Sequence, residues 1–165
     1  MADASYDWLA GTYWYVPHET LLAIAAVNGS TPAVEQLVDQ TVWRIERSFR
    51  GYVAGIAAVN FGGGWSYMLI AGSVAPGGAV RFGFSPLDST GSDALPTMGD
   101  GTLRGEGKTA SFLMQMTSGS AARNVSHWSY MLNVAPGDTQ WSSLPGYPQT
   151  GIPDLGGLRT PIVVK

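Results

Sequence analysis

The chain has 165 residues, a length that suits one domain with its own buried core. Hydrophobic residues make up 45% and charged residues only 13%, so the chain is not disordered by composition and carries little charge for its surface. The net charge of −3 argues against nucleic-acid binding, and the lack of cysteine excludes a disulfide framework and thiolate chemistry. No apolar run approaches the length of a membrane-spanning helix, and the amino end lacks the regions of a signal peptide, so we expect a cytoplasmic protein.

Short segments rich in β-branched and aromatic residues, separated by Gly and Pro, indicate an all-β protein. Strands are predicted at residues 9–16, 20–27, 41–49, 52–60, 65–74, 79–85, 102–107, 111–117 and 126–134. Turn residues such as Asn28-Gly29 lie between them. Eight or nine sequential strands with short links predict an antiparallel up-and-down β-barrel, because closure removes the exposed edges of a sheet.

One short helix is predicted at residues 33–38, between the second and third strands. Thr31 could cap this helix, and Pro32 suits the first helical position. The preceding segment, residues 21–27, is rich in Leu and Ala and could also be helical, but we interpret it as a strand.

The sequence divides into an expected barrel domain, residues 1–140, and an irregular carboxyl-terminal tail, residues 141–165. Prolines and glycines make regular structure unfavourable over most of the tail. The tail also holds apolar residues such as Trp141 and Leu144, which are costly to leave in water. We therefore expect it to pack on the barrel or on a neighbouring subunit. The low charge also favours a homo-oligomer, most simply a dimer, over a barrel covered by uncharged polar residues.

The pentapeptide Trp-Ser-Tyr-Met-Leu occurs at residues 65–69 and again at 128–132, and each copy is soon followed by Val-Ala-Pro-Gly. Either two similar strands with similar turns or an ancient duplication would explain the repeat. Because side chains alternate along a strand, several strands are predicted to be aromatic on one face. That face could line a ligand site, or it could be core or interface. The candidate ligand-binding residues are Trp14, Trp43, Trp65, Tyr67, Trp128 and Tyr130.

Few ionisable residues lie on the predicted strands. Arg44 and Glu46 are two apart and are therefore expected to face the same side. Inside a barrel, Arg44 could bind a ligand carboxylate and Glu46 could act as a general acid or base, whereas outside they would form a solvated pair. His127 lies in the middle of a strand and could titrate near neutral pH. No metal or other cofactor is expected, because the potential ligands are scattered and the glycine clusters fit turns better than a phosphate cradle.

Two resemblances to known families lie in the amino half. The segment Trp-Leu-Ala-Gly-Thr-Tyr-Trp, residues 8–14, resembles the first strand of lipocalin-like, or calycin, barrels. Tyr13 and Tyr15, followed by Arg44 and by Val-Ala-Gly at residues 53–55, are similar to the phenolic acid decarboxylases, which are lipocalin-like, cofactor-free lyases. This resemblance implies that the two tyrosines and the arginine hold a substrate carboxylate. The family's glutamate has no counterpart in residues 64–68, so a related cofactor-free reaction, such as isomerisation, cyclisation or another lyase step, stays open.

Three functions are compatible with these observations. The first is a cofactor-independent lyase or isomerase/cyclase acting on a small apolar or aromatic molecule inside the barrel. Its candidate catalytic residues are Tyr13, Tyr15, Arg44, Glu46 and His127. The second is a non-catalytic carrier or sensor of a small hydrophobic ligand. The third is a structural or assembly module whose barrel is packed solid. The interior of the barrel distinguishes them. A cavity with ionisable groups would indicate the enzyme, an apolar cavity the carrier, and a filled interior the structural module.

Overall fold

The computed structural model describes residues 6–18, 20–38, 40–60, 65–87 and 95–144, without the side chains of Thr20, Val38 and Trp65. These ranges contain β1 (Tyr13–Tyr15), β2 (Thr20–Val27), β3 (Ala33–Val38), β4 (Gln40–Phe49), β5 (Tyr52–Asn60), β6 (Trp65–Val74), β7 (Ala79–Pro86), β8 (Thr97–Arg104), β9 (Ser111–Gly119) and β10 (Arg123–Val134). They also contain three single-turn 3-10 segments, η1 (Asp7–Leu9), η2 (Gly107–Thr109) and η3 (Trp141–Ser143). No helix in this part of the chain is long and apolar enough to cross a membrane.

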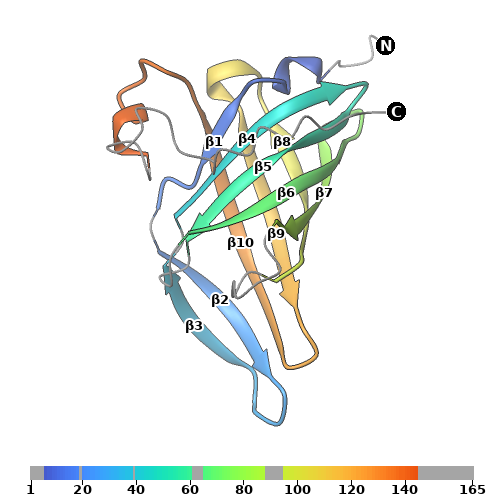
Figure 1. The fold of residues 1–165 in the computed structure, drawn as a ribbon, viewed down its shortest axis with the longest axis vertical. Helices are drawn as coiled ribbons and strands as arrows, with labels where there is room; N and C mark the ends of the chain where they lie inside the picture. Colours follow the sequence, from blue (N-terminus) through green and yellow to red (C-terminus); the bar gives the residue numbers. More distant parts are fainter. Residues whose placement is uncertain (1–5, 19, 39, 61–64, 88–94, 145–165) are drawn as a thin grey trace.

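Eight of the strands close into an antiparallel barrel, as Figure 1 shows. Strands β4 to β10 follow one another in sheet order as in chain order, and β1 pairs with both β4 and β10. Each strand therefore has a neighbour on both sides around the ring, which satisfies its backbone hydrogen-bonding groups. The all-β class and the antiparallel up-and-down barrel predicted from the sequence are confirmed.

The hairpin of β2 and β3 extends the sheet beyond the barrel, at the bottom of Figure 1. Strand β10 is long enough to pair with β1 near its carboxyl end and with β2 over residues 123–127. Strand β3 then pairs with β2. The sheet thus continues from β10 into β2 and β3 on the side of the β9–β10 turn.

The helix predicted at residues 33–38 is wrong, because this segment is strand β3. It pairs with β2 along its whole length, from the pair Ala25–Ala33 to the pair Thr20–Val38. The Asn28-Gly29 turn reverses the chain between the two strands, and Gly29 has the positive φ of 80° that glycine adopts easily. A six-residue helix is marginal alone, whereas the hairpin gives every residue a ladder partner. The interpretation of residues 21–27 as a strand is confirmed.

Several strand boundaries also differ from the prediction. The first strand covers only residues 13–15, because Asp7–Leu9 form η1 and Gly11 has a φ of 82°. Strand β8 begins five residues earlier than predicted, at Thr97, in a segment whose glycines and polar residues hide a strand pattern. Strand β10 begins at Arg123, three residues early, because it also serves the β2–β3 hairpin.

Two tail residues pack on the outside of the barrel. Trp141 and Leu144 are buried against Val134, with Tyr13 and Tyr15 beside them. The Tyr13 and Trp141 rings meet edge to face with their centroids 5.0 Å apart. Residues 145–165 lie outside the described residues, so the packing expected for the rest of the tail, and the boundary at residue 140, stay predictions.

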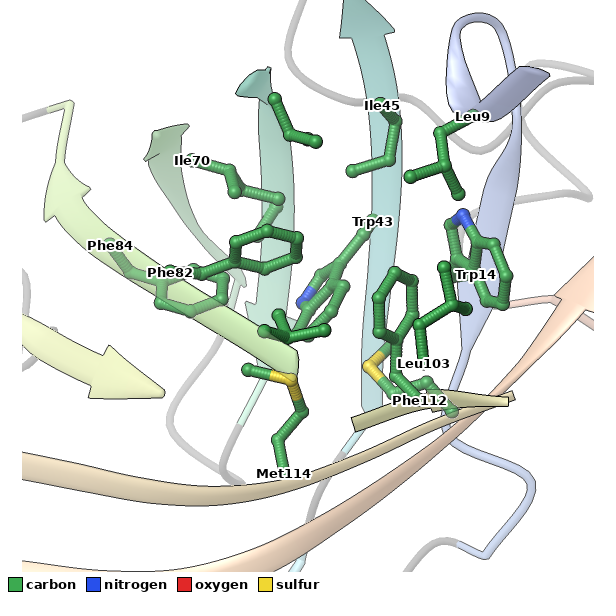
Figure 2. Packing of buried hydrophobic residues seen from close by; sticks show 14 of the residues in the cluster. Leu9, Trp14, Trp43, Ile45, Ile70, Phe82, Phe84, Leu103, Phe112 and Met114 are labelled. Carbon is green, nitrogen blue, oxygen red and sulfur yellow. The ribbon is translucent and has the colours of Figure 1, made fainter. Parts of the chain in front are cut away.

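Contacts between aromatic rings fill the part of the interior nearest η1 (Figure 2). The Trp43 ring centroid lies 6.0, 5.2 and 5.8 Å from those of Phe82, Phe84 and Phe112, and Trp14 lies 4.4 Å from Phe112. We call these five side chains, Trp14, Trp43, Phe82, Phe84 and Phe112, the aromatic plug. All are at most 4% exposed, so the plug forms a dry core of large apolar groups.

Candidate functional site

The inner surface of β8, β9 and β10 changes character toward the β9–β10 turn. The inward positions there carry small, polar or flexible side chains in place of aromatic rings. We call this surface the His127 wall, and its members are Thr97, Gly99, Met116, Ser118, His127 and Ser129. The register joins them directly, because His127 is opposite Met116, Met116 is opposite Gly99, and Ser118 is opposite Thr97. The wall is therefore one continuous patch across three strands.

His127 and Ser129 are buried polar residues on this wall. Their exposed fractions are 9% and 5%, and among the described residues only Thr41 joins them as a buried polar or charged residue. Both face inward because they alternate along β10 with the exposed Trp128 and Tyr130. Buried polar groups carry a desolvation cost that an apolar side chain would not. Their position inside a barrel is therefore a candidate for function.

Burial lowers the pKa of the His127 imidazole from 6.5 to about 4. The ring is consequently neutral near pH 7. A neutral imidazole offers one N–H donor and one nitrogen acceptor. His127 can thus both donate and accept a hydrogen bond or a proton inside the barrel.

A short polar pair marks the far end of the wall. The hydroxyl oxygens of Thr97 and Ser118 are 2.7 Å apart, and Thr97 Oγ1 also lies 2.9 Å from the carbonyl oxygen of Leu95. Thr97 has one hydroxyl proton, which it donates to the Leu95 carbonyl. Ser118 therefore donates to Thr97, and the pair keeps a fixed polarity at this end of the interior.

Methionines separate the polar side chains from the aromatic plug. Met114 is opposite Ser129, and Met116 is opposite His127, and both are buried. A Cβ atom on Gly99 would stand only 2.7 Å from Met116 Sδ and 2.8 Å from Met114 Cε, so glycine leaves the space that these side chains occupy. Unbranched thioether side chains adapt their shape readily. The wall can therefore change its contour without moving the backbone.

Two of the predicted ligand-binding residues, Trp14 and Trp43, face the interior. Both belong to the aromatic plug and are at most 1% exposed. Trp14 Nε1 donates to Thr12 Oγ1 at 2.8 Å, so its polar atom is already used within the protein. In this structure the two side chains pack within the same buried cluster that contains Met116 of the His127 wall.

The predicted carboxylate-binding residues gather on the outer face of the barrel. Tyr13 and Tyr15 alternate with the inward Trp14, and Arg44 is exposed opposite Tyr13. The Arg44 guanidinium carbon lies 5.7 Å from the centroid of the Tyr13 ring. The structure thus brings these three residues together, but a molecule enclosed by the barrel would not contact them. The larger apolar neighbours Trp14 and Trp43 take the inward positions, because they gain most from leaving water.

The alternation from which Arg44 and Glu46 are expected to face the same side is interrupted in the structure, so that expectation stays a prediction. The pairing of β4 with β5 shifts between Ile45 and Arg47, so Glu46 is the extra residue of a β-bulge. Ile45 is fully buried in the barrel core, whereas Arg44 and Arg47 are both exposed. The bulge interrupts the alternation on which the expectation rested.

The other candidate residues lie on the outer surface or outside the description. Tyr67 packs on the outer face beside Val42, Ile56 and Ala58. Trp128 and Tyr130 are 61% and 44% exposed. The Trp65 side chain lies outside the described atoms. The sequence analysis did not name Ser129, Met116 or the Thr97–Ser118 pair as site residues. The alternation along β10 does place residues 127, 129 and 131 on the face opposite to Trp128, which is a partial signal for Ser129.

Comparisons with protein-family models, curated proteins and solved structures find no match for this chain. Among the described residues, no group of three or more His, Asp and Glu side chains is arranged to hold a metal ion. The candidate site therefore rests on the geometry of the His127 wall.

Proposed function

We propose that the protein is a carrier or sensor that binds a small apolar or aromatic molecule inside the barrel, against the His127 wall. The observation that carries this proposal is the pair of buried polar side chains, His127 and Ser129, beside adaptable methionines. An apolar ligand body would contact Met114 and Met116. One hydrogen-bonding group of the ligand would meet the His127 imidazole or the Ser129 hydroxyl.

The barrel architecture supports this proposal through its shape. Eight-stranded barrels have interiors that are either filled by side chains or just able to hold one small ligand. Here the aromatic plug fills one part with rigid rings, and the proposal requires the unbranched side chains of Met114 and Met116 to change rotamer when a ligand enters the other part. Membership of the lipocalin-like, or calycin, group and a cytoplasmic location both fit the proposal. So does a homo-oligomer, which the low charge fraction favours.

The test is a titration of the protein, followed by tryptophan fluorescence, with a panel of phenols, aromatic acids and polyenes. We expect saturable quenching by one ligand class, because Trp43 belongs to the same buried core cluster as Met116 of the wall. The variant His127→Leu should weaken this binding at least tenfold. The matched control, Tyr130→Phe, changes an outward residue of the same strand and should bind as the wild type does. The proposal would be contradicted if no ligand class quenches the fluorescence, or if His127→Leu binds the ligand as tightly as the wild type does.

A cofactor-independent lyase or isomerase/cyclase is the second candidate, because His127 places a titratable side chain inside the barrel. An imidazole that is neutral at pH 7 can accept a proton from a bound molecule. The test is product analysis after incubation with each ligand that binds. Turnover that disappears in His127→Gln, while binding persists, would support catalysis. Binding without any product would support the carrier. Because Tyr13 and Arg44 lie on the outer face, Tyr13→Phe and Arg44→Met should leave any turnover inside the barrel unchanged; loss of turnover in either variant would contradict a reaction at the His127 wall.

A further inference from the structure

Strand β3 leaves one side of its ladder unpaired within the described chain. It ends the sheet order and pairs there with β2 alone, whereas each barrel strand has neighbours on both sides. The backbone groups on the outer side of β3 can therefore accept another strand. Figure 1 shows this strand at the margin of the molecule, away from the closed barrel.

The β3 edge has few of the features that usually protect a free edge, and Glu35 is its single charged residue. Its residues, Ala-Val-Glu-Gln-Leu-Val, include no Lys and no Pro, and its pairing with β2 contains no bulge. The adjoining outer face is apolar and uncharged, since Leu22, Ile24 and Val34 are 69%, 56% and 68% exposed. Such an edge can pair favourably with another strand whose facing residues are uncharged.

We propose that β3 pairs antiparallel with β3 of a second copy of this chain, about a two-fold axis that passes beside Gln36. A two-fold axis perpendicular to the sheet sets one residue opposite itself and keeps the outer faces of both copies on the same side. In this register Gln36 meets Gln36 of the second copy, and Glu35 meets Leu37. Two uncharged amides then occupy the centre, where each can donate to and accept from the other.

The neighbouring registers are less favourable. An axis at Glu35 would set two carboxylates opposite each other, which is destabilising. An axis at Val34 would place Pro32, which has no N–H, in the ladder opposite Gln36. An axis at Leu37 would bring two acidic residues of the sequence, Glu35 and Asp39, opposite each other. The register centred on Gln36 avoids all three conflicts.

An ion pair within the chain reduces the charge that Glu35 would present to Leu37 of the second copy. Glu35 lies 3.2 Å from the Arg123 guanidinium of its own chain, so its charge is already balanced before a second copy arrives. The occupant favoured by these observations is another copy, because the chain is poor in charge and its edge is complementary to itself. A ladder of about five residue pairs covers less than the roughly 800 Å² per partner of a standard interface, so we expect micromolar dissociation.

The absence of native cysteine allows a direct test of this register. Residues directly opposite each other in an antiparallel pair have Cα atoms about 4.5–5.5 Å apart, within the range that a disulfide spans. The single-cysteine variant Gln36→Cys should therefore form a disulfide-linked dimer under mild oxidation. Thr102→Cys is the matched control, because it lies on the exposed outer face of β8, a strand of the closed barrel, and it should not form a disulfide-linked dimer. Equal cross-linking of both variants, or of neither, would overturn the proposal.

Charge variants test whether residue 36 lies on the axis. Sedimentation velocity of the full chain from about 1 to 500 μM should show a monomer–dimer equilibrium. Gln36→Lys and Gln36→Glu should each raise the dimer Kd about tenfold or more, because each places like charges opposite each other. An equimolar mixture of the two should restore dimerisation, whereas Thr102→Lys should leave the Kd unchanged. A wild-type monomer at all concentrations, or a dimer that the Gln36 variants do not alter, would overturn the proposal.

Discussion

The two parts of the barrel interior are built on different principles. The aromatic plug consists of rigid rings that contact one another, and its members are at most 4% exposed. The His127 wall consists of hydroxyls, an imidazole, a glycine and a methionine that can take several rotamers. Rigid packing gives a barrel its stability and its single shape, whereas small polar and flexible groups give an interior its capacity to accommodate a ligand. We therefore expect the plug to contribute most to the stability of the core, whereas the wall is the part to which the proposed function assigns ligand binding.

The largest expected change in the free energy of unfolding follows from a substitution in the aromatic plug. Trp43→Ala removes a side chain that touches three other rings, so we expect a loss of about 3–5 kcal/mol in the free energy of unfolding. Urea denaturation followed by far-UV circular dichroism measures it. Trp128→Ala, at a site that is 61% exposed, is the matched control and should cost less than about 1 kcal/mol. Equal losses would show that the plug is not the centre of stability.

The second prediction concerns the pH dependence of the wall. Burial lowers the pKa of His127 to about 4 in the folded protein, against 6.5 when unfolded. The unfolded chain therefore binds a proton first as the pH falls. The contribution of this residue to stability is constant above about pH 6.5, decreases between 6.5 and 4, and is constant again below 4. The total loss across this window is about 3 kcal/mol.

His127→Gln isolates this contribution from the titration of other groups. We expect the stability of the variant, measured by urea denaturation at intervals between pH 4 and 8, to fall less than that of the wild type. Parallel curves for the two proteins would mean that His127 is not buried in the neutral form.

The third prediction compares two interior glycines. A Cβ atom on Gly72 would meet the carbonyl oxygen of Arg81 and stand 2.7 Å from Phe82 Cδ1, so Gly72→Ala should cost about 1–3 kcal/mol. A Cβ atom on Gly99 would meet the ends of two methionine side chains, which can move. Gly99→Ala should therefore cost clearly less in the same denaturation experiment. The reverse order would show that the wall is as rigid as the plug.

The smallest expected effect is on the polar pair of the wall. Ser118→Ala removes the hydroxyl that donates to Thr97 but leaves Thr97 bonded to the Leu95 carbonyl. We expect a loss of about 1 kcal/mol, measurable by thermal unfolding. Thr117→Ala is a suitable control, because its hydroxyl belongs to an exposed pair with Ser126 on the outer face of the same strand. A larger loss than that of Gly72→Ala would place the wall among the stability-determining parts of the core.

The sequence predicted the barrel because its signals are local. Alternating β-branched and aromatic residues and the turn residues between them define most strands without reference to the rest of the chain. It could not show which face points inward, since the outer face of β10 carries Trp128 and Tyr130 while the inner face carries His127 and Ser129. Which face points inward depends on how the strands close into a barrel, and the sequence of a single strand does not determine it. The rule that aromatic side chains face the interior holds for Trp14 and Trp43 and fails for β10.

The remaining differences have the same origin in long-range pairing. The segment that resembles a capped helix at residues 33–38 is a strand because β2 is available to pair with it. The bulge at Glu46 arises between β4 and β5, and neither strand alone indicates it. Of the candidate catalytic residues, His127 faces the interior, whereas Tyr13, Tyr15 and Arg44 lie on the outer face.

The short strand β1 also determines when the barrel can be completed during folding. Its neighbour β10 lies far along the chain, and the hydrogen bond from Asn133 Nδ2 to the Tyr13 carbonyl joins residues 120 positions apart. The connections of the meander from β4 to β10 contain at most ten residues, whereas closing β1 onto β10 costs the loop entropy of nearly the whole domain. Trp14 reaches the plug only with that step. We therefore expect a folding transition state in which the meander has formed while the seam at β1 is still open.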